Sequence, residues 1–180
     1  MRNDLEEILF TEEELKQRIR ELGEEITRDY AGKNPVFVGI LKGSFIFMGD
    51  LVRAVDLPCS IDFMSVSSYG NGTKTTGAVE IIKDLSQDIE GKDVIMIEDI
   101  LDTGVTLNYL MNLLGHRKPA SLAICTLLNK PARRHKDISL EAQYTGFVIP
   151  DAFVVGYGLD YAEKYRNLPY IGVLKPEIYS

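Results

Sequence analysis

The chain has 180 residues with a formal net charge of −7 at pH 7, and 45% of its residues are hydrophobic. This length fits one domain that buries a core without disulfides or structural metal, and the balance of apolar and charged residues excludes a disordered chain. The acidic charge argues against a nucleic-acid partner, because neutralising phosphates requires clustered lysine and arginine.

The first predicted element is a helix that begins after a capping box formed by Thr11 and Glu14. Its apolar residues recur at helical spacing, at Leu15, Ile19, Leu22 and Ile26. Gly32 is a suitable stop beyond its last turn. The pattern predicts an amphipathic helix with one face against a core.

The rest of the chain alternates between short apolar runs and helical segments. Strands are predicted at 36–41, 59–67, 79–83, 94–97, 122–128, 147–149, 153–155 and 170–174. Helices are predicted at 45–55 and 106–114, and a glycine- and threonine-rich loop at 69–77. Strands that are apolar throughout are typical of parallel sheets covered on both faces. We therefore predict an α/β fold with a central, mostly parallel sheet flanked by helices.

The most informative segment is VIMIEDILDTGVTL, residues 94–107. Each feature alone is compatible with an acidic turn before a capped helix, but the combination is rarer. Gly104 permits a tight turn that points several N–H groups at one spot, and Thr103 and Thr106 add hydroxyl donors. The following helix presents its positive end. Together they predict a phosphate cradle that needs no lysine or arginine.

Two adjacent carboxylates, Glu98 and Asp99, precede this turn. Ligands of parallel sheets bind beyond the carboxyl ends of the strands, which is where this pair is expected. Carboxylate oxygens suit both vicinal hydroxyls and a magnesium shell. The two histidines, His116 and His135, are isolated in the sequence and are expected at the surface rather than on a metal.

The segment resembles the phosphoribosyl-pyrophosphate motif of the type I phosphoribosyltransferases. Further segments are similar to the hypoxanthine-guanine members of that family, in the same order along the chain: 41–44 (LKGS), 68–69 (SY), Lys130 and 151–173. The resemblance runs from about residue 10 to residue 174. It implies a purine-salvage enzyme that joins hypoxanthine or guanine to phosphoribosyl pyrophosphate, giving IMP or GMP and pyrophosphate, with Mg²⁺ as cofactor.

The resemblance also implies how phosphoribosyl pyrophosphate is held. Lys42 and Gly43 would form the pyrophosphate loop, with a cis peptide between Leu41 and Lys42. Ser68 and Tyr69 would begin a lid over the substrates. The 5′-phosphate cradle would comprise Asp102, Thr103, Gly104, Val105 and Thr106. Val105 stands where some members carry lysine, so a supplementary charge is missing there.

The carboxylates receive metal and ribose roles from the same resemblance. Glu98 and Asp99 would hold the ribose hydroxyls and help to seat magnesium. Asp160 would bind a second magnesium, and Arg166 would reach the pyrophosphate with its two-pronged guanidinium.

The purine base has its own set of implied contacts. Asp102 would face N7 of the purine and accept its proton, the general-base role. Lys130 would donate to the 6-oxo group, Phe153 would stack on the ring, and Val154 would meet the base edge through its backbone. Ala152 stands where some relatives carry lysine.

The resemblance further implies that residues 1–180 form a single phosphoribosyltransferase domain, with a hood built from the N-terminal segment and the C-terminal region, in a homodimer or homotetramer. A xanthine-preferring relative and an RNA-binding regulator on the same fold are the alternatives. The net charge and Asp102 argue against the regulator.

Cys59 and Cys125 are expected to be buried free thiols. The first residues do not resemble a signal peptide and no run approaches the roughly 20 apolar residues of a membrane span, so we expect a cytoplasmic protein.

Overall fold

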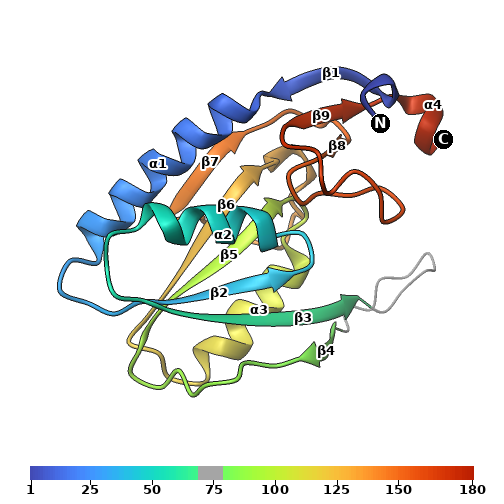
Figure 1. The fold of residues 1–180 in the computed structure, drawn as a ribbon. Coiled ribbons are helices and arrows are strands. Elements are labelled where there is room, and N and C mark those ends of the chain that lie inside the picture. The colour runs from blue at the N-terminus through green and yellow to red at the C-terminus, as the bar shows by residue number, and fades with distance from the viewer. Residues whose placement is uncertain (69–78) are drawn as a thin grey trace.

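The computed structural model describes residues 1–68 and 79–180, so the whole predicted loop at 69–77 lies outside the described residues. Six strands form the central sheet, in the order β4, β3, β2, β5, β6, β7 (Figure 1). Their bounds, in that order, are Val79–Lys83, Ser60–Ser68, Val36–Leu41, Asp93–Leu101, Ser121–Asn129 and Tyr144–Val148. All neighbours are parallel except β3 and β4. The predicted fold class is confirmed.

Helices cover both faces of this sheet (Figure 1). On one face lie α1 (Glu12–Asp29) and α2 (Phe45–Ala54), which pack with Phe37, Ile95 and Ile97 of the strands. On the other lies α3 (Val105–Gly115), which packs with Val38, Val94 and Met96. Alternate residues of each central strand therefore enter opposite halves of the core. The predicted capping box at Thr11 and Glu14 is present and begins α1.

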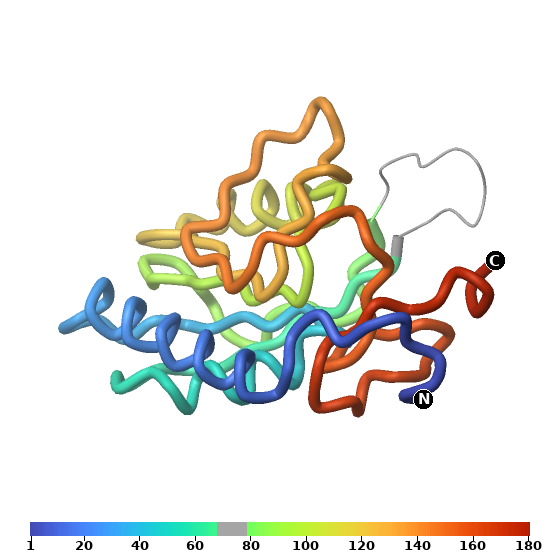
Figure 2. The backbone as a smooth tube through the Cα atoms, turned by 90° about the horizontal axis from the view of Figure 1, so that it is seen from above, coloured from blue at the N-terminus to red at the C-terminus, as the bar shows by residue number. Residues whose placement is uncertain are grey.

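A second, three-stranded sheet joins the two ends of the chain. β1 (Leu5–Phe10) pairs antiparallel with β9 (Ile171–Leu174), which pairs with β8 (Val154–Val155). Three short helices accompany these parts: η1 (Arg2–Asp4), η2 (Pro131–Arg133) and α4 (Pro176–Tyr179). Figure 2 shows both termini at the same end of the molecule. This small sheet stands over the carboxyl ends of the central strands (Figure 1).

Three sequence expectations need correction. Glu98 and Asp99 do not form a turn, because β5 continues to Leu101 with its backbone paired to β6. Pairing uses backbone groups, so a carboxylate side chain does not end a strand. The strand expected at 147–149 runs from Tyr144 to Val148. Cys125 is a buried free thiol, but Cys59, which lies just before β3, is only half-buried.

Candidate functional site

Two adjoining cavities lie at the carboxyl end of β5. The first has a volume of about 230 Å³. Its lining includes Glu98, Asp102, Thr103, Gly104 and Thr106, together with Leu41 and Val66 from the neighbouring strands. The second has a volume of about 250 Å³ and is lined by Asp99, Ile100, Asp102, Lys130, Phe153, Val154, Leu159 and Asp160. Ile100 and Asp102 line both cavities, which therefore adjoin one another.

The turn between β5 and α3 shapes the first cavity. Gly104 precedes α3 with a φ of 78°, a left-handed conformation that favours glycine. It is also tightly enclosed, because an added Cβ would lie 3.0 Å from Ile138 and 3.2 Å from Arg134. Val105 is the first residue of α3 and does not line the cavity. The turn therefore brings the backbone of residues 102–104 against the helix N-terminus, where an anion is stabilised.

Asp102 occupies the border between the two cavities. It is exposed, and its Oδ1 accepts a hydrogen bond from the Thr103 N–H at 2.7 Å. The hydroxyl of Thr103 accepts a long bond from Val105 N–H at 3.4 Å. The second carboxylate oxygen of Asp102 is thus available to a ligand in either cavity.

Glu98 and Asp99 form a close carboxylate pair at the end of β5. Burial, followed by the charges of Asp99 and Asp102, raises the pKa of Glu98 well above its usual range. Burial also raises the pKa of Asp99. Two desolvated neighbours of like charge favour a shared proton or a bound cation. Among residues 1–68 and 79–180, no group of three or more His, Cys, Asp or Glu side chains converges on one metal position.

The loop after β2 lies directly against this pair. The Leu41–Lys42 peptide is cis, as the resemblance implies. A Cβ on Gly43 would collide with the Asp99 carboxylate. A Cβ on Gly158, whose φ is 105°, would collide with the Gly43 carbonyl. Glycines at both positions therefore allow the 42–43 loop to fit between β5 and the segment after β8.

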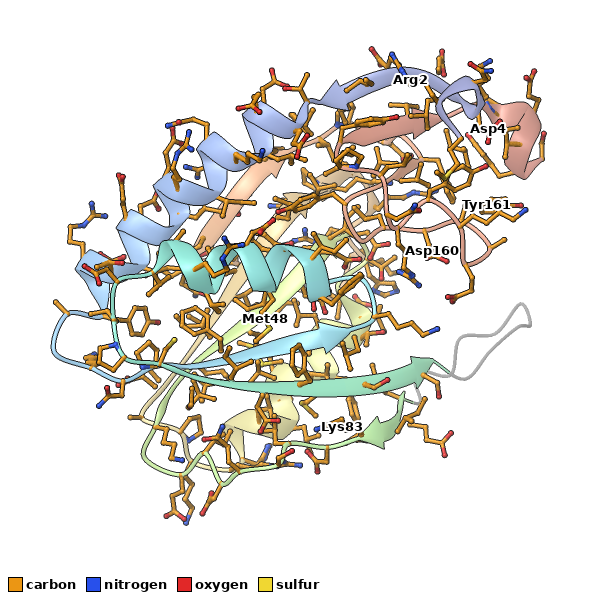
Figure 3. The ribbon with its side chains drawn as sticks, viewed as in Figure 1. Arg2, Asp4, Met48, Lys83, Asp160 and Tyr161 are labelled. Atoms are coloured by element: carbon orange, nitrogen blue, oxygen red, sulfur yellow. The ribbon has the colours of Figure 1, made fainter. Side chains whose placement is uncertain are left out.

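An ion-pair network connects the 42–43 loop to the segment after β8. Lys42 Nζ lies 3.1 Å from Glu163, and Arg166 lies 3.5 Å from the same residue. Arg166 also lies 3.3 Å from Asp160 and donates to the Gly158 carbonyl at 2.7 Å. Figure 3 shows Asp160 on the segment between the small sheet and the central strands. Arg166 Nε is buried and finds no acceptor among the described residues.

Lys130 and Phe153 both line the second cavity. Lys130 is 8% exposed, and its ammonium donates to the Ala152 carbonyl at 2.7 Å, with Asp151 at 3.9 Å. Since an ammonium carries three donors, others remain for a ligand. Phe153 is 36% exposed and stacks on Tyr179, with ring centroids 4.6 Å apart.

The structure thus brings together most of the residues that the sequence singled out. Lys42 and Arg166 reach the site through the ion-pair network rather than by lining a cavity. Ser68 ends β3, pairing through its backbone with Val79, and Tyr69 lies outside the described residues. Sequence reasoning missed Glu163 and Arg134. Arg134 does not line the predicted phosphate cradle, but it contacts the turn and donates to the Asp102 carbonyl at 2.9 Å.

Comparison with known proteins identifies close relatives. Residues 6–162 match the family described as the phosphoribosyl transferase domain. A hypoxanthine-guanine phosphoribosyltransferase of Staphylococcus aureus is 61% identical over all of this chain and 99% of its own length. A bifunctional protein TilS/HprT of Listeria monocytogenes is 58% identical, and this chain spans 28% of its length. The crystal structure of a hypoxanthine phosphoribosyltransferase from Staphylococcus aureus superposes with a TM-score of 0.96 and 60% identity, covering 100% of this chain and 97% of that one.

Proposed function

This chain belongs to the phosphoribosyltransferase family, and we propose that it transfers the 5-phosphoribosyl group of phosphoribosyl pyrophosphate to N9 of hypoxanthine or guanine. The products are IMP or GMP and pyrophosphate, and the role is purine salvage. One observation carries the assignment of the base: a carboxylate, an ammonium and an exposed aromatic ring, from Asp102, Lys130 and Phe153, line a single cavity next to the phosphate turn.

The base fits the second cavity by complementary chemistry. Lys130 donates to the 6-oxo oxygen of the purine, and Phe153 offers a flat apolar surface to its ring. Val154, which is buried beside them in β8, meets the base edge through its backbone. Asp102 faces N7 from the border with the first cavity.

The phosphoribosyl group extends from there along the carboxyl ends of the strands. The 5′-phosphate lies on the turn formed by Asp102, Thr103, Gly104, Val105 and Thr106. Glu98 and Asp99 accept hydrogen bonds from the ribose hydroxyls. Lys42 and Arg166 exchange their partner Glu163 for the pyrophosphate, and the 42–43 loop supplies backbone contacts.

In the reaction, N9 of the purine forms a bond to the anomeric carbon while the bond to pyrophosphate breaks. The pyrophosphate departs with the electron pair, and Asp102 accepts the proton of N7. The chain contributes mainly by holding the two reactants in line and by stabilising the departing anion with Lys42 and Arg166.

The carboxylates of Glu98, Asp99 and Asp160 suit Mg²⁺, which prefers hard oxygen ligands and commonly takes one or two carboxylates together with substrate oxygens. Glu98 and Asp99 would hold one ion and Asp160 a second. The raised pKa values of Glu98 and Asp99 fit a pair that is completed by a cation. When bound, Mg²⁺ supplies neutralisation of the pyrophosphate charge.

Chelation is therefore expected to remove turnover. With excess EDTA, the pyrophosphate anion would face Glu98, Asp99 and Asp160 without a divalent partner. Like charges that lie close together repel strongly. The measurement is IMP formation from hypoxanthine with and without EDTA, with restoration by added MgCl₂ as the control. Full activity in EDTA would contradict the metal assignment.

The surrounding parts of the molecule receive corresponding roles. The small sheet of β1, β9 and β8 serves as a hood within a single domain of residues 1–180. Ser68, at the end of β3, and Tyr69 are assigned to substrate binding. We expect a homodimer or homotetramer in the cytoplasm. No helix among the described residues has the length and apolar character that a bilayer crossing requires.

A further inference from the structure

Three consecutive backbone carbonyl groups of the phosphate turn accept hydrogen bonds from one segment, residues 130–135. The Leu101 carbonyl accepts a hydrogen bond from the Lys130 N–H at 2.9 Å. The Asp102 carbonyl accepts one from Arg134 Nε at 2.9 Å. The Thr103 carbonyl accepts one from the His135 N–H at 3.0 Å. No residue of this segment except Lys130 lines either cavity.

These bonds fix which way the N–H groups of the turn point. Among the described residues, the only cis peptide is Leu41–Lys42. The peptides between residues 101 and 104 are therefore trans. In a trans peptide the carbonyl and the following N–H point in opposite directions. Carbonyls that are tied to the 130–135 segment therefore direct the N–H groups of Asp102, Thr103 and Gly104 away from it. The Thr103 N–H already meets an anionic oxygen, the Asp102 carboxylate, at 2.7 Å.

Arg134 is the only one of these three donors that uses its side chain, and further hydrogen bonds fix the position of that side chain. Its guanidinium also donates to the Asn129 amide oxygen at 2.7 Å and to the Leu140 carbonyl at 3.3 Å, with Leu101 O at 3.5 Å. All four acceptors are neutral, so they do not cancel the charge of the guanidinium. Its Cδ lies 3.2 Å from where a Cβ of Gly104 would stand. Arg134 thus supplies both a hydrogen bond that fixes the turn and a positive charge next to it, on the side away from its N–H groups.

We propose that Arg134 is a positioning residue for the phosphate end of the substrate: it holds the 102–104 turn in its anion-binding conformation and adds its positive charge from behind. It lines neither cavity and contacts the phosphate turn only at its backbone, so its effect is expected mainly on phosphorylated ligands. Lysine at this position keeps the charge but cannot donate to several acceptors in one plane. This inference rests on the proposed function for the identity of the substrate.

The test compares Arg134→Met and Arg134→Lys with the wild type, and Arg133→Met is the matched control. Arg133 is adjacent, exposed and paired with Asp151 at 3.0 Å, without a contact to the turn. Calorimetry with ribose 5-phosphate reports on the phosphate site without any turnover. Steady-state kinetics then give KM separately for phosphoribosyl pyrophosphate and hypoxanthine.

Arg134→Met is expected to weaken ribose 5-phosphate binding and to raise KM for phosphoribosyl pyrophosphate by about tenfold or more, since charge-assisted hydrogen bonds are lost. KM for hypoxanthine should change by less than about threefold. For ribose 5-phosphate affinity and KM for phosphoribosyl pyrophosphate, Arg134→Lys should lie between the wild type and Arg134→Met. Arg133→Met should match the wild type. Thermal unfolding without ligand controls for misfolding. Equal ribose 5-phosphate affinity in the wild type and Arg134→Met would overturn the proposal, as would an equal rise in both KM values. A wild type that binds ribose 5-phosphate but uses neither hypoxanthine nor guanine overturns the proposed function and leaves the Arg134 comparison intact.

Discussion

Lys130→Gln is expected to lower the preference for 6-oxopurines over adenine by about 100-fold or more. An ammonium donates hydrogen bonds and accepts none, so the 6-amino group of adenine would place a donor against the buried ammonium of Lys130. A site built for a polar partner rejects an analogue that lacks it by roughly 10⁴-fold. Glutamine can both donate and accept, and the penalty against adenine largely disappears.

The measurement is kcat/KM for hypoxanthine, guanine, xanthine and adenine with wild type and Lys130→Gln. Guanine should remain a good substrate, and xanthine should be slower, because it presents an oxygen in place of the 2-amino group. Lys136→Gln is the control, because Lys136 is exposed and outside the cavity. Unchanged selectivity in Lys130→Gln would remove Lys130 from the discriminating role.

Lys130 should also make the discrimination against adenine depend on pH, in a direction that can be predicted. Burial lowers the pKa of Lys130, so its ammonium loses a proton at a lower pH than an exposed lysine would. The neutral amine carries a lone pair that can accept from adenine. Discrimination against adenine should therefore be strongest at low pH and weaken as pH rises toward the lowered pKa, whereas Lys130→Gln should show no such trend.

Asp102→Asn is expected to lower kcat by about 10²–10⁴-fold, the usual cost of losing a general base. The amide oxygen can still accept from the Thr103 N–H, so the turn should keep its shape. KM for phosphoribosyl pyrophosphate should then change little, because backbone groups form most of the cradle. This pattern separates Asp102 from Arg134, whose replacement raises that KM.

Single-turnover kinetics test this assignment, because they report the chemical step without product release. Asp137→Asn is the matched control, since Asp137 is an exposed carboxylate that lines neither cavity. A single-turnover rate in Asp102→Asn within about threefold of the wild type would show that another group accepts the proton.

Much of the fold could be predicted because strongly apolar strands and a capped helix leave local signals. Residues 36–41 and 79–83 were predicted with the bounds that the structure has. β1 was missed, because register shifts in its pairing with β9 disturb the alternation that indicates a strand. The carboxyl end of β5 was missed because Glu98 and Asp99 interrupt the apolar run while the backbone pairing continues.

The turn at 102–106 was predicted because its residues are consecutive in sequence, and the family resemblance indicated distant residues such as Lys130 and Asp160, which line the second cavity. Arg134 was not predicted, because it reaches Asp102 from 32 residues away and lies in the exposed-looking run Arg133 to Lys136. Glu163 was missed for the same reason, since only tertiary structure brings it to Lys42. Contacts between backbone carbonyls and a distant side chain leave no periodic or compositional signal.

The central claim is tested most directly by pyrophosphate release from phosphoribosyl pyrophosphate, measured with Mg²⁺ and each free base in turn. The account predicts rapid release with hypoxanthine and guanine, slower release with xanthine, and release near the base-free level with adenine and with the pyrimidines uracil and orotate. Asp102→Asn serves as the control with a slowed chemical step. Release that is no faster with hypoxanthine or guanine than without any base, or fastest with adenine, would contradict the account.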